Sequence, residues 1–309
     1  MKIAVTGAFG YSGRYIAKRL LEGGHEVITL TNSFRRPNPF GDSVKAFPFH
    51  FEEPTLLKES LQGTDVLINT YWVRFDHRQF THDEAVANTK TLFHAAKGAG
   101  VRRIVHVSIT NPDIHSDLPY FRGKAELESA LQALGLSHCI LRPTVLFGKE
   151  DVLINNIAWS LRHLPVFGVF GTGDYKLQPI HVDDLAAAAV TKATGQANEI
   201  IDAIGPETFT YRELVATVGR LLGLRRLIIP VPPELGYLMC RFLGLLVRDV
   251  VITREEIRGL MENRLWVSAP PLGGTNLTDW IAEHRQTLGR RYTSELARRS
   301  DRISRYASN

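Results

Sequence analysis

Three glycines close to the start of the chain constrain the fold more than any other feature of the sequence. Gly7, Gly10 and Gly13 come directly after the apolar run Ile3–Val5 and open a segment with helical periodicity. Without side chains, the chain can turn tightly there, bring main-chain N–H groups up to a pyrophosphate and pack a helix against a strand. The start of that helix adds N–H donors and partial positive charge. The residues that we expect around a dinucleotide pyrophosphate are Gly7, Phe9, Gly10, Tyr11, Ser12 and Gly13. The alternative is a tight turn with a structural role alone.

Short apolar runs alternate with helical segments through the first 200 residues. The strand candidates are Ile3–Val5, Glu26–Thr31, Val44–Phe49, Asp65–Asn69, Ile104–Ser108 and His138–Leu141. The helical segments Ser12–Glu22, Glu84–Lys97 and Tyr120–Leu134 each end at a glycine, which accepts the left-handed conformation that closes a last turn. This alternation predicts an α/β fold, a doubly wound parallel sheet of the Rossmann type, with ligands beyond the carboxyl ends of its strands.

The domain organisation follows from the point near residue 200 where this alternation weakens. We expect a dinucleotide-binding domain over residues 1–203 and a smaller, mainly helical lobe over residues 204–309. Residues 149–176 are expected to belong partly to that lobe, which would bind the substrate or a partner.

Charge and composition exclude several classes of function. The formal net charge of +5 and the isoelectric point near 9.2 fit an anionic ligand as well as a nucleic acid. The basic residues form only short doublets such as Arg102-Arg103, so we expect no nucleic-acid partner. Cys139 and Cys240 lie in apolar stretches and are expected to be buried free thiols, and the scattered histidines predict no metal site. The first residues lack the features of a signal peptide, which predicts a cytoplasmic protein.

The longest apolar region, Leu227–Val251, raises the question of a membrane segment. Three prolines and several charged residues interrupt it, whereas a bilayer span needs about 20 mainly apolar residues, so we expect no transmembrane segment. Glu234–Leu246 still predicts an amphipathic helix. That helix would pack as a cap or at an oligomer contact, or would touch a membrane, a quinone or another lipid-like molecule. The oligomeric state does not follow from the sequence.

The choice of cofactor is read at the end of the second expected strand. An acidic residue there suits the ribose hydroxyls of NAD, whereas arginine suits the additional phosphate of NADP. The stretch Leu30–Arg36 contains no carboxylate, and the next acidic residue is Asp42. Asn32, Arg35 and Arg36 are therefore expected beside the adenosine ribose, which favours NADP, with NAD as the alternative. The competing interpretation is that both arginines are solvated loop residues.

Several further motifs, together with the glycine pattern, resemble the short-chain dehydrogenase/reductase superfamily. They are Ser108 at the end of the fifth expected strand, Tyr120-Phe121-Arg122-Gly123-Lys124, Leu141–Gly148 and Gln178–Ala186. These motifs are similar to the extended and atypical members, which include sugar-nucleotide epimerases and NmrA-like proteins. The C-terminal third, with Asp249–Glu256 and Leu288–Tyr292, resembles bacterial relatives of the nucleotide-binding accessory subunit of respiratory complex I. The resemblance also implies that Pro143 lies beside the cofactor.

The resemblance implies a role for each residue of the expected active site. Tyr120 would be the catalytic acid/base, and Lys124 would be its partner and a ligand of the cofactor ribose. Ser108 would polarise the substrate, a role for which Thr110 competes, and Asn88 would support the site from the preceding helix. The chemistry is consistent, because a phenol titrates at about pH 10 and a lysine one helical turn away lowers its pKa. A Tyr-x-x-x-Lys pair is common, however, and a solvated or packing role is the alternative.

The chain departs from the family pattern at two expected cofactor contacts. After the third strand, where the family commonly places an acidic residue near the adenine, stand His50 and Phe51. They would stack on or hydrogen-bond to the base, or His50 would lie at the surface. After the fourth strand, Thr70, Tyr71 and Trp72 stand where smaller residues are usual. The two aromatic residues would narrow the nicotinamide pocket or line an apolar substrate site, with core packing as the alternative.

Two functions of different classes follow from these observations. The first is an oxidoreductase or epimerase that holds NADP(H) or NAD(H) and acts on a small, apolar carbonyl or hydroxyl substrate through Tyr120 and Lys124. The apolar C-terminal third favours such a substrate over a sugar nucleotide. The second is a non-catalytic NADP(H)-binding structural or assembly protein, in which the nucleotide stabilises the fold and the lobe contacts a partner or a quinone-rich membrane complex.

Overall fold

Seven parallel strands form the sheet of the first structural unit, which comprises Met1–Pro143 and Val182–Ala203. In spatial order the strands are β11 (Glu199–Ala203), β6 (Ser137–Pro143), β5 (Arg103–Val107), β4 (Val66–Asn69), β1 (Lys2–Thr6), β2 (Glu26–Leu30) and β3 (Val44–Phe47). Each strand pairs with its neighbours in parallel. The computed structural model describes residues 1–34, 36, 38–76 and 80–300. The prediction of a doubly wound parallel sheet is confirmed.

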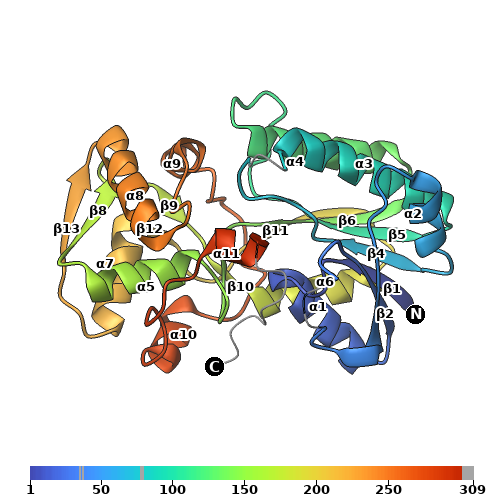
Figure 1. The fold of residues 1–309 in the computed structure, drawn as a ribbon, viewed down its shortest axis with the longest axis horizontal. Coiled ribbons are helices and arrows are strands. Elements are labelled where there is room, and N and C mark those ends of the chain that lie inside the picture. The colour runs from blue at the N-terminus through green and yellow to red at the C-terminus, as the bar shows by residue number, and fades with distance from the viewer. Residues whose placement is uncertain (35, 37, 77–79, 301–309) are drawn as a thin grey trace. The chain divides into compact units, whose positions relative to one another are not determined.

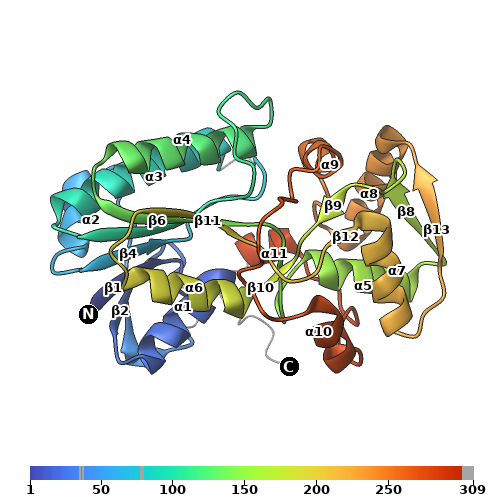
Figure 2. The same ribbon diagram turned by 180° about the vertical axis from the view of Figure 1, so that it is seen from behind.

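Burial on both faces of the sheet explains the continuous apolar runs of its strands. In β1, Ile3, Ala4 and Val5 have no exposed surface, and Ile3 lies in register between Val27 of β2 and Val66 of β4. Two layers of helices cover the sheet (Figures 1 and 2). On one face lie α2 (Pro54–Ser60), α3 (His82–Gly98) and α4 (Pro119–Ala133), and on the other lie α1 (Tyr11–Glu22) and α6 (Val182–Ala193).

The strand order reverses between β1 and β4. From β1 the chain continues to β2 and β3 on one side of the sheet, and it then crosses to β4, β5 and β6 on the other side. In open α/β sheets, ligands bind beyond the carboxyl ends of the strands at such a switch point. The glycine turn after β1 and the segment after β4 flank this position.

The second unit contains Thr144–His181 and the chain from Ile204 onward. Its helices are α5 (Leu153–His163), α7 (Tyr211–Leu221), α8 (Pro233–Val247), α9 (Arg254–Met261), α10 (Leu277–His284) and α11 (Glu295–Ser300). Its short strands pair as β7 (Leu146–Phe147) with β10 (Ile180–His181), β8 (Val166–Phe170) with β13 (Leu227–Val231), and β9 (Lys176–Leu177) with β12 (Phe209–Thr210). Most of the regular structure of this unit is helical.

The apolar region Leu227–Val251 folds as two elements of this unit, β13 and α8. Within the described residues, no helix is both long and apolar enough to cross a membrane. The same part of the chain shows no cluster of histidine, cysteine and acidic side chains suited to a metal ion. Both cysteines are free thiols; Cys139 is buried as predicted, whereas Cys240 on α8 is only partly buried.

Candidate functional site

The glycine turn joins β1 to α1 through close backbone contacts, which leave no room for a side chain at Gly13. Gly7 has a φ of 66°, in the left-handed region, and its N–H donates to the carbonyl of Leu30 at 2.9 Å. The Gly10 N–H donates to the Gly7 carbonyl at 2.7 Å. An ideal Cβ on Gly13 would lie 2.8 Å from the carbonyl carbon of Gly7 and closer still to its oxygen. The first turn of α1 therefore rests directly on the backbone of the loop.

The start of α1 has the properties of an anion site. Its N-cap residue, Gly10, makes no side-chain capping bond, and its first turn holds no acidic residue. The first N–H groups of a helix lack intrahelical partners, and the helix dipole adds positive charge there. The loop is held in place from β2, because Thr29 Oγ1 accepts the Ala8 N–H at 3.0 Å and donates to the Val5 carbonyl at 2.8 Å. The backbone and charge at this turn fit a pyrophosphate.

A second set of hydrogen bonds ties the end of β4 to the end of β1. Thr70 donates its hydroxyl to the Thr6 carbonyl and its N–H to Thr6 Oγ1, each at 2.7 Å. Thr6 Oγ1 donates in turn to Asn69 Oδ1 at 3.0 Å, which also accepts the Tyr71 N–H at 3.1 Å. The predicted contacts Thr70 and Tyr71 thus lie next to the glycine turn, at the switch point of the sheet.

A neutral histidine lies beneath this network. Asn69 Nδ2 contacts Nδ1 of the fully buried His106 at 3.0 Å, which makes Nδ1 the acceptor and places the ring proton on Nε2. Burial, and then the charge of Lys124, lowers the pKa of His106 well below its usual value. His106 therefore stays uncharged at neutral pH and acts as a hydrogen-bond partner inside the sheet.

The residues predicted for the adenosine end lie where β2 and β3 finish. Asn32 Oδ1 accepts the Phe49 N–H at 3.2 Å, so this amide oxygen already joins the two strand ends. His50 has a φ of 44°, in the left-handed region. The Phe51 ring stacks on Phe49 with centroids 4.8 Å apart and lies 5.2 Å from the Tyr71 ring. Arg36 is half-buried, and Arg35 lies outside the described residues.

Helix α4 carries Tyr120, Lys124 and Glu128 four residues apart, so that they share one side of the helix. Lys124 is 2% exposed; its Nζ donates to the Val107 carbonyl at 2.8 Å and lies 4.3 Å from the centre of the Trp72 ring. Burial lowers the pKa of Lys124 to about 7, while the charge of Glu128 raises it. The lysine therefore titrates near neutrality and is held at the carboxyl end of β5.

Trp72 contacts both members of the Tyr-x-x-x-Lys pair. Its ring centre lies 5.5 Å from that of Tyr120, with the planes nearly perpendicular at 82°, and 4.3 Å from Nζ of Lys124. The indole lies against α4 at Gly123, where an ideal Cβ would come within 3.0 Å of Trp72 Cη2. The buried His82 also contacts Tyr120, with ring centres 5.7 Å apart. Tyr120 thus stands in a mainly aromatic setting.

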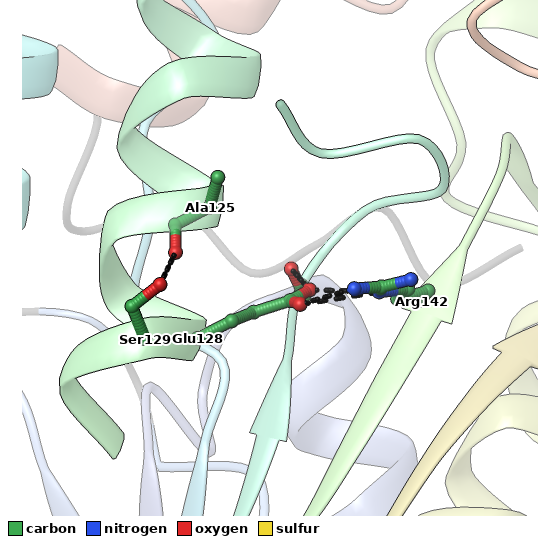
Figure 3. Close-up of polar contacts among 5 residues, drawn as sticks. Ala125, Glu128, Ser129 and Arg142 are labelled. Atoms are coloured by element: carbon green, nitrogen blue, oxygen red, sulfur yellow. Dashed lines mark hydrogen bonds and ion pairs between the residues drawn. The ribbon is translucent and has the colours of Figure 1, made fainter. Parts of the chain in front are cut away.

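A partly buried ion pair anchors the other end of this row of side chains. Glu128 reaches from α4 toward Arg142 on β6 (Figure 3), with Nη2–Oε2 at 2.5 Å and Nε–Oε1 at 3.0 Å. Ser108 Oγ donates to the same carboxylate at 2.5 Å. The side chain of Glu128 is 4% exposed and that of Arg142 is 28% exposed. The network fixes α4 against β5 and β6. Within it, the hydroxyl of Ser108 donates its proton to the Glu128 carboxylate.

Two other predicted residues lie beside this row. Asn88 Nδ2 donates to the phenol oxygen of Tyr71 at 3.0 Å, which links α3 to the segment after β4. Burial raises the pKa of Tyr71 despite this hydrogen bond, so Tyr71 remains a neutral phenol. Pro143 ends β6, and its carbonyl accepts the N–H of Thr110 at 3.0 Å. Thr110 is buried.

Sequence reasoning missed Glu128 and the role of Arg142. The spacing that connects Tyr120 with Lys124 continues for one more turn to Glu128, and this signal was available in the sequence. Arg142 stands inside the Leu141–Gly148 motif, but its partner could not be inferred because the two residues come from different elements.

A doubly wound sheet with a glycine turn and a helix start at its switch point defines a dinucleotide-binding protein of the Rossmann class. A family model described as the NAD dependent epimerase/dehydratase family matches residues 3–202, and the chain belongs to this family. The resemblance to the extended branch of the short-chain dehydrogenases/reductases is confirmed. Membership of this family also confirms the expectation that the cofactor is a nicotinamide dinucleotide, but it does not distinguish NAD from NADP.

Known proteins of two kinds resemble the chain. The mitochondrial NADH-ubiquinone oxidoreductase 40 kDa subunit of Neurospora crassa is 28% identical over 239 residues, which are 75% of this chain and 63% of that subunit. The match therefore spans less than two-thirds of that relative. Triphenylmethane reductase of Citrobacter sp. complexed with NADP(H) has the same fold, with a TM-score of 0.77 and 18% identity over 92% of this chain and 99% of the reductase. The Bordetella bronchiseptica enzyme WbmH in complex with NAD+ gives a TM-score of 0.60 and 18% identity over 74% of this chain and 85% of the enzyme.

Proposed function

We propose that the protein is an oxidoreductase or epimerase that prefers NADP(H) and acts on a small, apolar carbonyl or hydroxyl substrate. The observation that carries this proposal is the Tyr120/Lys124 pair on α4, with Lys124 buried at the end of β5. Both residues belong to the same unit as the glycine turn. A bound dinucleotide would supply or accept the hydride.

In this proposal the chain itself moves the proton. Tyr120 Oη takes the proton of a substrate hydroxyl during oxidation and returns it during reduction. Because a phenol titrates at about pH 10, its anion must be stabilised for this transfer near neutrality. The positive charge of Lys124 provides that stabilisation, and Glu128 on the next turn favours the charged lysine.

The proposed substrate class rests on the side chains around Tyr120. Trp72 and Phe121 contact its ring, at centre distances of 5.5 and 5.6 Å. In the segment after β4, which also holds Trp72, Phe80 lies edge-on to Tyr71, with ring centres 5.6 Å apart. Such a wall favours a flat or apolar carbonyl compound, such as a ketone or a quinone, over a sugar.

The proposed preference for NADP rests on Arg36 and on the lack of an acidic side chain between the end of β2 and Asp42. A charge-assisted hydrogen bond to a phosphate contributes about 1.5–3 kcal/mol, equivalent to roughly 10–100-fold in affinity. Calorimetric titration tests this directly. Arg36→Ala should weaken NADPH binding by about tenfold or more and leave NADH binding unchanged; equal losses for both cofactors would contradict the preference.

The catalytic proposal is tested with Tyr120→Phe, using Tyr237→Phe in the second unit as the matched control. We expect Tyr120→Phe to bind NADPH as the original protein does but to lose NADPH oxidation by apolar ketones and quinones at least a hundredfold, the range expected for a general acid. Tyr237→Phe should retain the activity. If Tyr120→Phe keeps full activity, the assignment of Tyr120 is wrong.

A non-catalytic role is the second candidate, and two observations favour it. The matched relatives include the 40 kDa subunit of a mitochondrial NADH-ubiquinone oxidoreductase. In addition, Lys124 already donates to the Val107 carbonyl and lies over the Trp72 ring. In this role the dinucleotide stabilises the first unit and no substrate is turned over. Saturable NADPH binding with a raised melting temperature, together with no turnover for any carbonyl compound tested, would support this second candidate.

A further inference from the structure

Helix α8 presents large apolar side chains to solvent. Leu235, Leu238, Met239, Phe242, Leu245 and Leu246 are between 52% and 77% exposed, and we call this set the α8 face. Their spacing of three and four residues places them within an arc of about 120° along one side of the helix. Soluble proteins rarely leave so continuous an apolar stripe uncovered, and such a stripe marks an interaction site.

The opposite side of α8 is fixed to the body of the second unit by two glycines. An ideal Cβ on Gly236 would lie 2.7 Å from the Phe170 ring, and one on Gly244 would lie 2.6 Å from the carbonyl oxygen of Asp249. The backbone of α8 therefore packs closely beside β8 and β13 (Figure 1), with Phe170 as the last residue of β8. This packing determines which side of the helix turns outward.

The charged residues along α8 leave a positive excess beside the α8 face. Glu234 is the only acidic residue of α8, and it is neutralised by Arg254, with Nη2–Oε2 at 2.9 Å. Arg241 lies one turn from Leu238 and from Leu245, so it borders the face, and Arg248 follows the helix as its C-cap. Both arginines are exposed, and neither forms an ion pair within the described residues. The C-terminal half of the face is thus apolar with two unneutralised positive charges.

We propose that the α8 face binds the surface of a bilayer that contains anionic phospholipids. At about 1.5 Å per residue, a helix of 15 residues is about 22 Å long, too short to cross a hydrocarbon core of about 30 Å. It lies in the plane of the interface instead, with the apolar side chains among the acyl chains and the arginines at the lipid phosphates. A second copy of the chain fits less well, because the α8 face of that copy would offer the two arginines no acidic side chain except Glu234, which already pairs with Arg254.

Flotation with lipid vesicles tests the proposal on the full chain. We expect binding to vesicles of phosphatidylcholine mixed with phosphatidylglycerol, weaker binding to phosphatidylcholine alone, and loss of binding as the salt concentration rises. Phe242→Ser/Leu245→Ser should lower the partition coefficient more than tenfold. Arg241→Gln/Arg248→Asn should lower it about thirtyfold, at about fivefold for each arginine, and asparagine suits the left-handed backbone of residue 248. Ile200→Ser, which alters an exposed apolar residue on β11, is the matched control and should bind normally.

Circular dichroism verifies that each variant is folded, and the arginine variant keeps the test valid if the apolar variant does not fold. The proposal is overturned if the original protein ignores anionic vesicles, or if the arginine variant binds them equally well. It is also overturned if light scattering shows a dimer that Phe242→Ser/Leu245→Ser dissociates while no form of the protein binds vesicles.

Discussion

Replacement of Gly13 by alanine is the sharpest test of the cofactor site. An ideal Cβ at this position would lie 2.8 Å from the carbonyl carbon of Gly7 and 3.1 Å from the Ala8 nitrogen. Ordinary carbon–carbon contacts are about 3.5–4.0 Å, so the first turn of α1 must move roughly 1 Å away from the loop. Both elements that would bind the pyrophosphate are thus displaced by one methyl group.

The magnitude follows from two opposing effects. Overpacking of this kind costs about 1–3 kcal/mol, whereas alanine is favoured over glycine inside a helix by about 1 kcal/mol. We therefore expect Gly13→Ala to lower the free energy of unfolding by at most about 2 kcal/mol. Cofactor affinity should fall more steeply, by about 10–100-fold, because hydrogen bonds to the charged pyrophosphate contribute about 1.5–3 kcal/mol each.

Urea denaturation and calorimetric titration with NADPH measure these two quantities separately. Gly98→Ala at the end of α3 is the matched control, because its Cβ would lie 3.5 Å from Lys58 Cδ, an ordinary contact. That variant should be as stable as the original protein or slightly more stable, and its Kd for NADPH should not change. If folded Gly13→Ala binds NADPH with the original Kd, the turn does not hold the pyrophosphate.

Three further predictions concern buried and partly buried groups of the structure. Glu128→Gln should lower the free energy of unfolding by about 2–4 kcal/mol in urea denaturation, because Arg142 then loses the partner of its charge, and Glu128→Gln/Arg142→Gln should recover part of the loss; an unchanged stability would contradict a structural role for the pair. Lys124 has a pKa of about 7 in the folded chain and about 10.4 in the unfolded chain. Between these two pH values the unfolded chain therefore binds a proton at Lys124 that the folded chain has lost. The free energy of unfolding of the cofactor-free protein should therefore rise between about pH 7 and 8.5, by at most about 1.4 kcal/mol per pH unit, and the rise should vanish in Lys124→Met. Burial raises the pKa of Cys139 and of Cys240 to about 11, so iodoacetamide at about pH 8 should alkylate both thiols slowly in the native protein and rapidly in urea, as mass spectrometry can follow.

The elements that the sequence predicted are those whose signal is local. Six strands of the first unit were expected within a few residues of their bounds, because strands buried on both faces read as continuous apolar runs. The helix expected over Glu234–Leu246 is α8. The short helix α2 and the edge strand β11 were not expected, since α2 has only seven residues and β11 carries two acidic residues in five.

The candidate site divides in the same way. Local spacing was enough to single out the glycine turn and the Tyr120/Lys124 pair. The spacing of three glycines and a separation of one helical turn are both properties of neighbouring residues. The partners of these residues could not be predicted from the sequence. Glu128 meets Arg142 and Ser108, and Trp72 rests on Gly123, only because α4 packs on the carboxyl ends of β4, β5 and β6.

The sequence by itself determined the alternation of strands and helices, the dinucleotide turn and the amphipathic helix near the C-terminus. Tertiary structure alone decided that Ser108 donates its hydroxyl proton to a buried carboxylate and that burial lowers the pKa of Lys124 to about 7. It also decided that the apolar side of α8 faces outward. The physical reason is that desolvation and exposure depend on which distant segments pack over a side chain, and the spacing of neighbouring residues does not specify those segments.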